Sequence, residues 1–137
     1  MDDKEKCAWK LFPVKSISDE RGVLSVLEYC KDFSFPIKRV FWISSVENQS
    51  IIRGKHAHKE LKQILFVPQG SCKISLENTD AAKEEYTLKP GYALFLDGLV
   101  WRYMHDFTRD CSLIVLVDRV FDEDYVIRDY KEFQAYK

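Results

Sequence analysis

The chain has 137 residues, of which 46% are hydrophobic and 14% aromatic, and a formal net charge of −1 at pH 7. This length and composition predict one globular domain, residues 1–137, with a core large enough to fold without disulfide staples. The near-zero charge, without a basic block, argues against nucleic-acid binding, and no run of about 18 apolar residues could span a membrane.

The N-terminal residues and the cysteines both indicate a cytoplasmic protein. Residues 1–6 are polar and mixed in charge, unlike a secretory signal peptide. The four cysteines are scattered, without a C-x-x-C pair, so we expect reduced core thiols rather than disulfides or a zinc site. These cysteines are Cys7, Cys30, Cys72 and Cys111.

The first half of the chain alternates short β-branched or aromatic runs with turn signals, a pattern that predicts strands. Gly22 tolerates positive φ in a turn over residues 18–22, and Pro36 marks a loop over residues 32–36. A further turn over residues 47–50 leads toward two closely spaced histidines. The predicted strands cover residues 9–14, 23–28, 37–44, 50–52 and 53–58.

The second half continues the pattern and ends differently. The run over residues 111–117 is almost continuously apolar, which predicts a fully buried strand. Near the end, Val126, Tyr130 and Phe133 recur at i, i+4 and i+7, and Asp122 or Asp124 could cap a helix. The predicted strands cover residues 61–67, 71–77, 86–88, 92–96, 100–107 and 111–117.

This order of elements predicts the fold class. About ten short strands at regular spacing, joined by turns, are typical of an all-β sandwich or barrel. A short helix is expected only at the C-terminal end. The sequence contains no internal repeat, linker or low-complexity segment.

His56 and His58 are two of the three histidines in the chain, and they stand two residues apart. In an extended strand their side chains point to the same face. Two adjacent imidazoles can bind a metal ion or can transfer protons. The plainer alternative is a pair of hydrogen-bonded polar groups in the core, and the spacing next to a glycine-containing turn favours a functional pair.

The residues around this pair resemble the cupin signature, in which His-x-His is followed by a Glu, a Gly and a later His. Here Gln63 takes the place of the Glu and Arg102 that of the last His, with Gly70 at the turn. Arg102 offers only donors and a permanent positive charge, which a divalent cation cannot use. His105 lies an odd number of residues from Arg102 and would face the other way on a regular strand. We therefore expect no metal.

A closer resemblance runs from about residue 9 to residue 133. Several motifs together are similar to the sugar 3,4-ketoisomerases, which act on dTDP-4-oxo-6-deoxy-glucose in the synthesis of 3-amino-3,6-dideoxyhexoses. They are Glu20-Arg21-Gly22, Ile37-Lys38-Arg39-Val40, Arg53-Gly54-x-His56-Ala57-His58-Lys59, Gly70-Ser71-Cys72, Val100-Trp101-Arg102, Met104-His105-Asp106-Phe107 and the stretch from Asp122 to Tyr130.

The resemblance implies a cupin jelly-roll barrel, a homodimer that can exchange N-terminal strands, and no metal or other cofactor. It also implies that His56 is the main base and His58 assists it. The base would remove the C3 proton of the ketosugar, an enediol would form, and a proton would return at C4. Arg102 and Gln63 are candidate donors to the enediolate oxygen.

The diphosphate of such a substrate needs cationic partners. Arg21, Arg39, Arg53 and Arg128 are candidates because arginine binds phosphate in a bidentate manner, although each could instead be a solvated surface residue. Strand alternation places Arg53 on the face opposite His56. Trp42 and Trp101 could stack on thymine, but aromatic side chains of a small barrel more often belong to the core.

The chain departs from the family at one position and leaves others open. The family often has Tyr-Tyr where this chain has Phe41-Trp42, so a tyrosine proton donor is missing there. Members differ at the positions of Arg21 and Arg102, which leaves the C4 stereochemistry of the product open. The alternatives to a ketoisomerase are a 3,5-epimerase of the same substrates, a non-catalytic sugar-nucleotide-binding cupin and a metal-dependent oxygenase.

Overall fold

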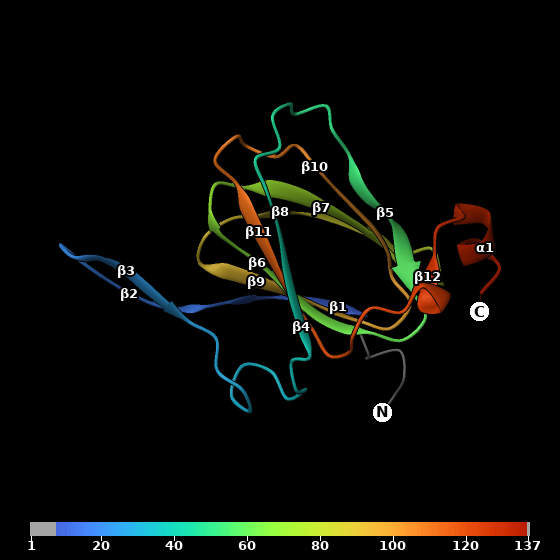
Figure 1. Ribbon diagram of the computed structural model, residues 1–137, viewed down its shortest axis with the longest axis horizontal. Coiled ribbons are helices and arrows are strands. Elements are labelled where there is room, and N and C mark those ends of the chain that lie inside the picture. The colour runs from blue at the N-terminus through green and yellow to red at the C-terminus, as the bar shows by residue number, and fades with distance from the viewer. Residues whose placement is uncertain (1–7, 137) are drawn as a thin grey trace.

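A computed structural model describes residues 8–136, and most of these residues lie in antiparallel strands. Two five-stranded sheets pack face to face, and a two-stranded hairpin stands away from them (Figure 1). The first sheet has the order β1 (Trp9–Pro13), β9 (Tyr92–Asp97), β6 (Lys62–Gln69), β11 (Ser112–Val117) and β4 (Arg39–Ser44). The second has the order β12 (Val126–Ile127), β5 (Arg53–His58), β10 (Trp101–His105), β7 (Cys72–Glu77) and β8 (Lys83–Leu88).

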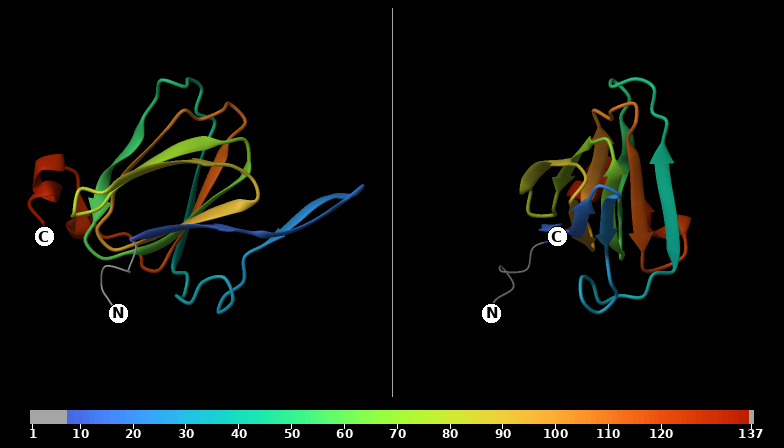
Figure 2. Two further views of the ribbon diagram at one scale, coloured as in Figure 1. Left: turned by 180° about the vertical axis from the view of Figure 1, so that it is seen from behind. Right: turned by 90° about the vertical axis from the view of Figure 1, so that its left-hand side faces the viewer.

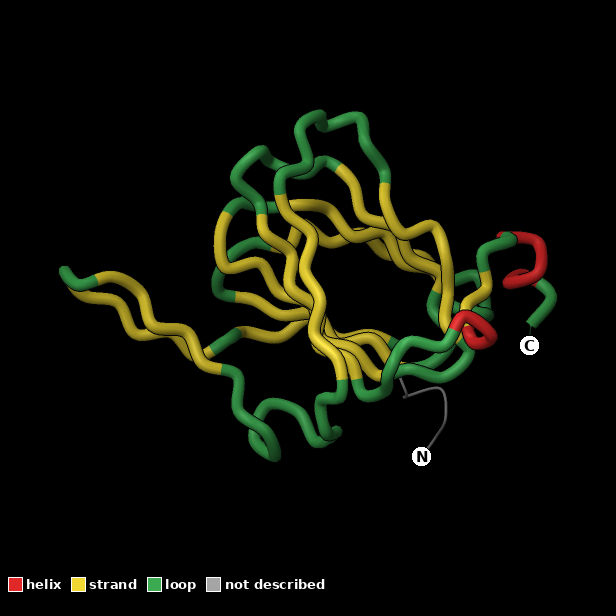
Figure 3. The backbone as a smooth tube through the Cα atoms, in the orientation of Figure 1, coloured by secondary structure: helices red, strands yellow, loops and turns green. Residues whose placement is uncertain are grey.

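Alternating burial along the strands shows which side chains the sheets turn toward each other. Apolar residues two apart on β7 and β11 are buried, while their neighbours are partly exposed. The main core lies between the two sheets, and its largest fully buried members include Leu65, Ile74, Leu94, Leu113 and Phe107. The two sheets therefore form the walls of a jelly-roll barrel, as the strand pattern and the cupin resemblance predicted (Figure 3).

The outer face of each sheet is partly covered. On the first sheet, Phe35 from the loop before β4 packs on Ile64 and Ala93. On the second, the C-terminal segment packs on Ala57 and Trp101. This segment contains the 3₁₀ turn η2 (Glu123–Tyr125), β12 and the helix α1 (Tyr130–Gln134).

The hairpin of β2 (Lys15–Asp19) and β3 (Gly22–Val26) extends away from the barrel (Figure 2). Every residue of β2 is exposed, and so is most of β3. The sequence predicted only the second of these strands, because Lys15–Asp19 carries no alternating apolar pattern and has no core to pack on.

Other predicted elements need correction. Residues 50–52 form a loop rather than a strand, and β11 is only alternately buried because its second face is partly open to solvent. The C-terminal helix is shorter than predicted. Val126 belongs to β12, which pairs with β5, and the helix is capped by Asp129, whose side chain accepts from the Lys131 N–H.

The predicted place of the cysteines in the core is confirmed for two positions. Cys72 and Cys111 are free thiols in the core, whereas Cys30 is exposed, and Cys7 lies outside the described residues. Across residues 8–136, we find no helix with the length and apolar character needed to cross a membrane.

Candidate active site

A β-bulge shapes the strand that carries the histidine pair. In the pairing of β5 with β10, His56 lies opposite Arg102 and Arg53 lies opposite Met104, so β5 has one extra residue between these pairs. Gly54 absorbs it with a φ of 80°. The bulge reverses the alternation, and Arg53 lines the same cavity as His56. The prediction that Arg53 faces away was therefore wrong, because it assumed a regular strand.

The two imidazoles face each other inside the barrel. Their Nε2 atoms are 3.1 Å apart, and the rings meet edge to face with centroids separated by 4.7 Å. One Nε2 must therefore donate a hydrogen and the other accept it. The prediction that His56 and His58 point the same way is confirmed.

Gln63 and Arg102 connect the two sheets beside this pair. Arg102 Nη1 donates to Gln63 Oε1 over 2.5 Å, and Arg102 Nε donates to the carbonyl of Val100 over 3.1 Å. Both side chains are buried. Gln63 comes from β6 in the first sheet and Arg102 from β10 in the second, so this hydrogen bond crosses the barrel interior.

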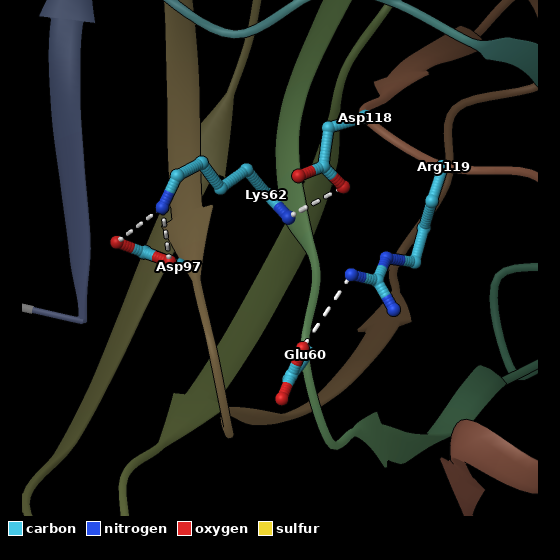
Figure 4. Close-up of polar contacts among 5 residues, drawn as sticks. All are labelled: Glu60, Lys62, Asp97, Asp118 and Arg119. Carbon is cyan, nitrogen blue, oxygen red and sulfur yellow. Dashed lines mark hydrogen bonds and ion pairs between the residues drawn. The ribbon is translucent and has the colours of Figure 1, made fainter.

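A group of polar contacts holds the start of β6, next to Gln63 (Figure 4). The Lys62 backbone N–H donates to Asp118 Oδ1 over 3.1 Å, and Lys62 Nζ lies 3.2 Å from Asp97 Oδ1. One residue beyond Asp118, Arg119 Nη2 lies 3.4 Å from Glu60 Oε1. These contacts tie β6 to β9 and to the end of β11, which positions Gln63 toward Arg102.

The cavity lined by His56, Gln63 and Arg102 has a volume of about 210 Å³. Its walls combine polar side chains with apolar and aromatic ones, as is typical of small-molecule sites. Its mouth includes Trp42, which is 66% exposed. The other lining residues include Phe41, Ile43, Arg53, His56, Gln63, Arg102 and Met104.

Burial and positive charge make both imidazoles poor proton acceptors. Burial first, and then the Arg102 guanidinium, lowers the pKa of His56 to about 3 and that of His58 to about 2. Burial also lowers the pKa of Arg102 to about 9. At neutral pH the pair is therefore uncharged and Arg102 is a cation.

The predicted phosphate-binding arginines occupy different places. Arg39 lies against the rings of Phe41 and Phe121, with its guanidinium carbon 4.8 and 5.2 Å from their centroids, and it lines a hollow together with His58. Arg128 forms an exposed ion pair with Glu123 at 2.9 Å. The charges of Arg39 and Arg128 lower the pKa of His58, which is evidence that both lie near the pair.

Arg21 is not part of this cavity. It lies at the turn of the β2–β3 hairpin, where it pairs with Asp19 over 2.7 Å, and the hairpin leads away from the barrel. Trp101 also lies elsewhere. It packs against Tyr130 and Phe133 on the outer face of the second sheet, next to an open groove of about 580 Å³ that contains neither histidine of the pair.

Sequence reasoning missed several residues beside His58. Arg119, Asp122 and Tyr125 line the same hollow, and Arg119 rests on the ring of Tyr125 at 5.1 Å. They come from the connection between β11 and β12. Asp122 and Tyr125 fall in a stretch that the resemblance had singled out, but nothing in the sequence pattern shows that this connection folds back over β5.

The nitrogen and oxygen atoms of His56, His58 and Gln63 do not form a suitable site for a divalent cation. The two Nε2 atoms engage each other, and the amide oxygen of Gln63 already accepts from a cation. Among residues 8–136, we find no group of three or more His, Cys, Asp or Glu side chains that could hold a metal ion. His105 lies on the other face of β10, where its Nε2 is 2.9 Å from Ser75 Oγ, as its odd spacing from Arg102 predicted.

Comparison with protein families and curated proteins gives consistent results. The family model described as FdtA, WxcM-like, C-terminal, matches residues 7–137. The TDP-4-oxo-6-deoxy-alpha-D-glucose-3,4-oxoisomerase of Aneurinibacillus thermoaerophilus is 38% identical over 127 residues, which are 93% of this chain and 91% of that protein.

Solved structures are similar over the same length. One is the 3,4-ketoisomerase QdtA of Thermoanaerobacterium thermosaccharolyticum, as a histidine-to-asparagine variant in complex with TDP-4-keto-6-deoxyglucose. It has a TM-score of 0.86 and 38% identity, covering 93% of this chain and 91% of that chain. The WlaRB TDP-quinovose 3,4-ketoisomerase of Campylobacter jejuni has a TM-score of 0.85 and 35% identity, covering 93% and 98%. The 3'-monoepimerase ChmJ of Streptomyces bikiniensis, with a TM-score of 0.77 and 15% identity over 87% and 68%, shares the fold alone.

Proposed function

The chain belongs to the FdtA, WxcM-like family, and from this we propose that it is a sugar-nucleotide 3,4-ketoisomerase that uses the His56–His58 pair for proton transfer. Its substrate is TDP-4-oxo-6-deoxyglucose, and its product carries the keto group at C3. The observation that carries the proposal is the partly buried pair of imidazoles, which contact each other where His56 lines a cavity together with the Gln63–Arg102 bridge.

The reaction needs a base, a stabilised intermediate and a returned proton. A proton on the carbon beside a ketone is acidic because the resulting carbanion is an enolate. His56 removes the C3 proton, and the enediol then receives a proton at C4. A positioned base of this kind contributes roughly 10²–10⁴-fold to the rate. His58 assists by exchanging a hydrogen with His56 across their Nε2 contact of 3.1 Å.

Arg102 and Gln63 stabilise the oxygen on which negative charge develops. Arg102 remains protonated at neutral pH because its pKa, although lowered by burial, is about 9. Donors held in a buried site act more strongly on a developing charge than they would in water. The amide of Gln63 fixes one edge of the guanidinium, and thereby orients the rest of it.

Three arginines around the cavity bind the diphosphate in this proposal. Arg53 lines the cavity itself, Arg39 lines the hollow beside His58, and Arg128 is close enough for its charge to lower the pKa of both histidines. Arg128 would exchange its exposed partner Glu123 for phosphate oxygens, at little cost because exposed ion pairs are weak.

We further propose that the protein is a homodimer in which the β2–β3 hairpin of one protomer reaches its partner. The hairpin exposes Ile17, Val23 and Leu24, and β4 exposes Val40 and Trp42, which are unusual apolar surfaces for a monomer. Arg21 at the hairpin turn would then act on the partner's cavity rather than on its own.

Two other expectations stay predictions. Residues 1–137 are expected to form one cupin domain, which the family match over residues 7–137 supports. The cytoplasmic location is likewise expected from the sequence alone.

The decisive experiment is to incubate the purified protein with TDP-4-oxo-6-deoxyglucose in deuterated water and follow the sugar by NMR. A 3,4-ketoisomerase produces the 3-oxo sugar without deuterium at C5, and the product is trapped as an amino sugar by a 3-aminotransferase. Deuterium at C5 would instead identify a 3,5-epimerase. The absence of any product would favour a non-catalytic binding protein.

A further inference from the structure

The buried Arg102 guanidinium has no carboxylate partner among the described residues. Its contacts are the amide oxygen of Gln63 and the carbonyl of Val100, which are both neutral. Only 3% of this residue is exposed, so water does not screen the charge well. A buried charge without a counter-charge is costly unless another group supplies one.

Arg39 is in a similar situation. Its guanidinium lies against the rings of Phe41 and Phe121, and within residues 8–136 it forms no ion pair. Aromatic faces attract a cation but carry no net charge that would cancel it. Among the residues that the structure describes, two cations on different sheets, Arg39 on β4 and Arg102 on β10, therefore lack an anionic partner.

The charged and titratable groups around the histidine pair have an excess of positive charge, even though Arg119 is paired with Glu60 at 3.4 Å. The carboxylate of Glu123 is already engaged by Arg128, and the side chain of Asp122 caps η2 by accepting from the Asp124 N–H. The groups near the pair are Arg53 on β5, Arg102 on β10, Arg39 on β4, Arg119, Asp122 and Glu123 between β11 and the end of η2, Tyr125 on η2, and Arg128 after β12.

We propose that the diphosphate of the bound substrate supplies this missing negative charge and thereby makes the His56–His58 pair a stronger base. The substrate thus increases the basicity of the imidazole that deprotonates it, and Arg39, which binds the diphosphate beside His58, couples the two. This inference rests on the proposed function, since it requires a nucleotide diphosphate at the mouth of the cavity.

The expected rise in the pKa of His56 and His58 follows from the charges that act on the imidazoles. Arg102 and Arg39 lower the pKa of His58, and Arg102 lowers that of His56. An anion that neutralises these cations removes part of the lowering. In general, a unit charge about 8 Å away at an effective dielectric constant of about 20 changes a pKa by about one unit or more. A base whose pKa is closer to the working pH transfers protons with a better driving force.

The test is a pH titration of the three histidines, followed by NMR of the imidazole C–H signals in protein carrying labelled histidine. The probe is TDP-glucose, which keeps the diphosphate diester but has no keto group, and calorimetry establishes that it is bound. We expect the midpoints of His56 and His58 to rise by about one pKa unit or more on saturation. The imidazole signals of His105, on the outer face of β10, are the internal control for effects of the ligand that do not arise in the cavity.

Variants at arginine positions separate the effect of charge on the two histidines from other effects of ligand binding. In the free Arg39→Gln protein, the titration midpoints of His56 and His58 should lie above those of the wild type. TDP-glucose should raise these midpoints by less than it does in the wild type. The matched control is Arg109→Gln, which removes an exposed arginine from the β10–β11 turn and should behave as the wild type. A rise that is undiminished in Arg39→Gln would overturn the role of Arg39.

Kinetics give a second readout with the true substrate. The acid limb of kcat, which reports the complex, should lie at higher pH than the acid limb of kcat/KM, which reports the free enzyme. TDP-glucose that binds without raising the two midpoints, or acid limbs that coincide, would overturn this inference and leave the ketoisomerase proposal intact. A failure of TDP-glucose to bind would contradict both.

Discussion

His56 and His58 combine two properties that a proton-transfer pair needs, which are mutual contact and a common neutral state. Their Nε2 atoms are 3.1 Å apart, and burial together with Arg102 keeps both rings uncharged at neutral pH. A lone pair is thus available on the pair without prior loss of a proton. The same surroundings that keep the rings neutral also weaken them as bases, which is why a bound anion matters to the proposed chemistry.

Replacement of the proposed base should remove activity and keep the fold. We expect His56→Asn to lower kcat by roughly 10²–10⁴-fold, because the amide cannot accept the C3 proton. The change is measured by NMR of the product, with circular dichroism as the check on folding. His105→Asn is the matched control and should retain activity, since His105 bonds to Ser75 on the outer face. Full turnover by His56→Asn would reject the assignment.

The lowered pKa of both histidines also predicts how the free energy of unfolding depends on pH. In the unfolded chain these rings titrate near their ordinary value of 6.5, whereas in the folded protein they stay neutral to about pH 3 and 2. Below pH 6.5 the unfolded state therefore binds more protons, so the free energy of unfolding falls as the pH drops toward 3 and is flat above 6.5. The slope is up to about 1.4 kcal/mol per pH unit for each ring.

Urea unfolding at several pH values measures this slope. His56→Asn should flatten it between pH 6.5 and 4, because one of the two rings is gone. Equal slopes in the wild type and His56→Asn would contradict the depressed pKa of His56.

At the scale of elements, the bulge in β5 assembles the cavity. Gly54 adopts a φ of 80°, and the extra residue returns Arg53 to the face of His56. The place of Gly54 is also sterically restricted, since a Cβ there would lie 2.9 Å from Met104 Cε. A short stretch of β5 thus determines both the direction of the His56 side chain and the position of the Arg53 cation.

Gly54→Ala should therefore destabilise the protein and impair substrate binding. The positive φ alone costs about 1–2 kcal/mol for a residue with a Cβ, and contact with Met104 adds to this. Gly98→Ala is the matched control, because Gly98 has a φ of 76° with nothing within 4 Å of its Cβ position. Urea unfolding should show a larger loss for Gly54→Ala than for Gly98→Ala.

A double variant isolates the contact itself. Gly54→Ala combined with Met104→Ala should cost less than the sum of the two single changes, since the smaller side chain leaves room for the new methyl group. Additive costs would mean that the backbone conformation, and not the contact with Met104, restricts this position.

At the scale of the whole molecule, the β2–β3 hairpin is a separate sheet that pairs with no other described strand. It extends from the barrel (Figure 2), and its side chains Ile17, Val23 and Leu24 are exposed. An isolated two-stranded hairpin is at best marginally stable in water. In the proposed homodimer, a second copy of the chain would cover these apolar side chains and thereby stabilise the hairpin.

Sedimentation analysis tests this assembly. The wild type is expected to sediment as a dimer, and Ile17→Glu/Leu24→Glu should shift it toward the monomer, because two charges cannot be buried against an apolar partner surface. Ile51→Glu, at a partly exposed apolar residue away from the hairpin, is the control and should remain dimeric. A wild-type protein that is monomeric at micromolar concentration would contradict the proposal.

The sequence by itself determined the all-β class, most of the strands and the pairing of His56 with His58, because two-residue periodicity depends only on the local backbone. These features depend on side-chain chemistry and short spacing, which a linear pattern preserves. The resemblance to the cupin signature, rather than spacing, placed Gln63 and Arg102 where metal cupins have ligands.

Only the tertiary structure decided where the arginines lie. Arg53 enters the cavity because a bulge breaks the alternation, Arg119 and Tyr125 reach His58 because a connection folds back over β5, and Arg21 leaves the site because its hairpin has no core beneath it. Each of these outcomes depends on contacts between residues far apart in the chain. Local periodicity carries no information about such contacts, so they become visible only once the sheets are packed.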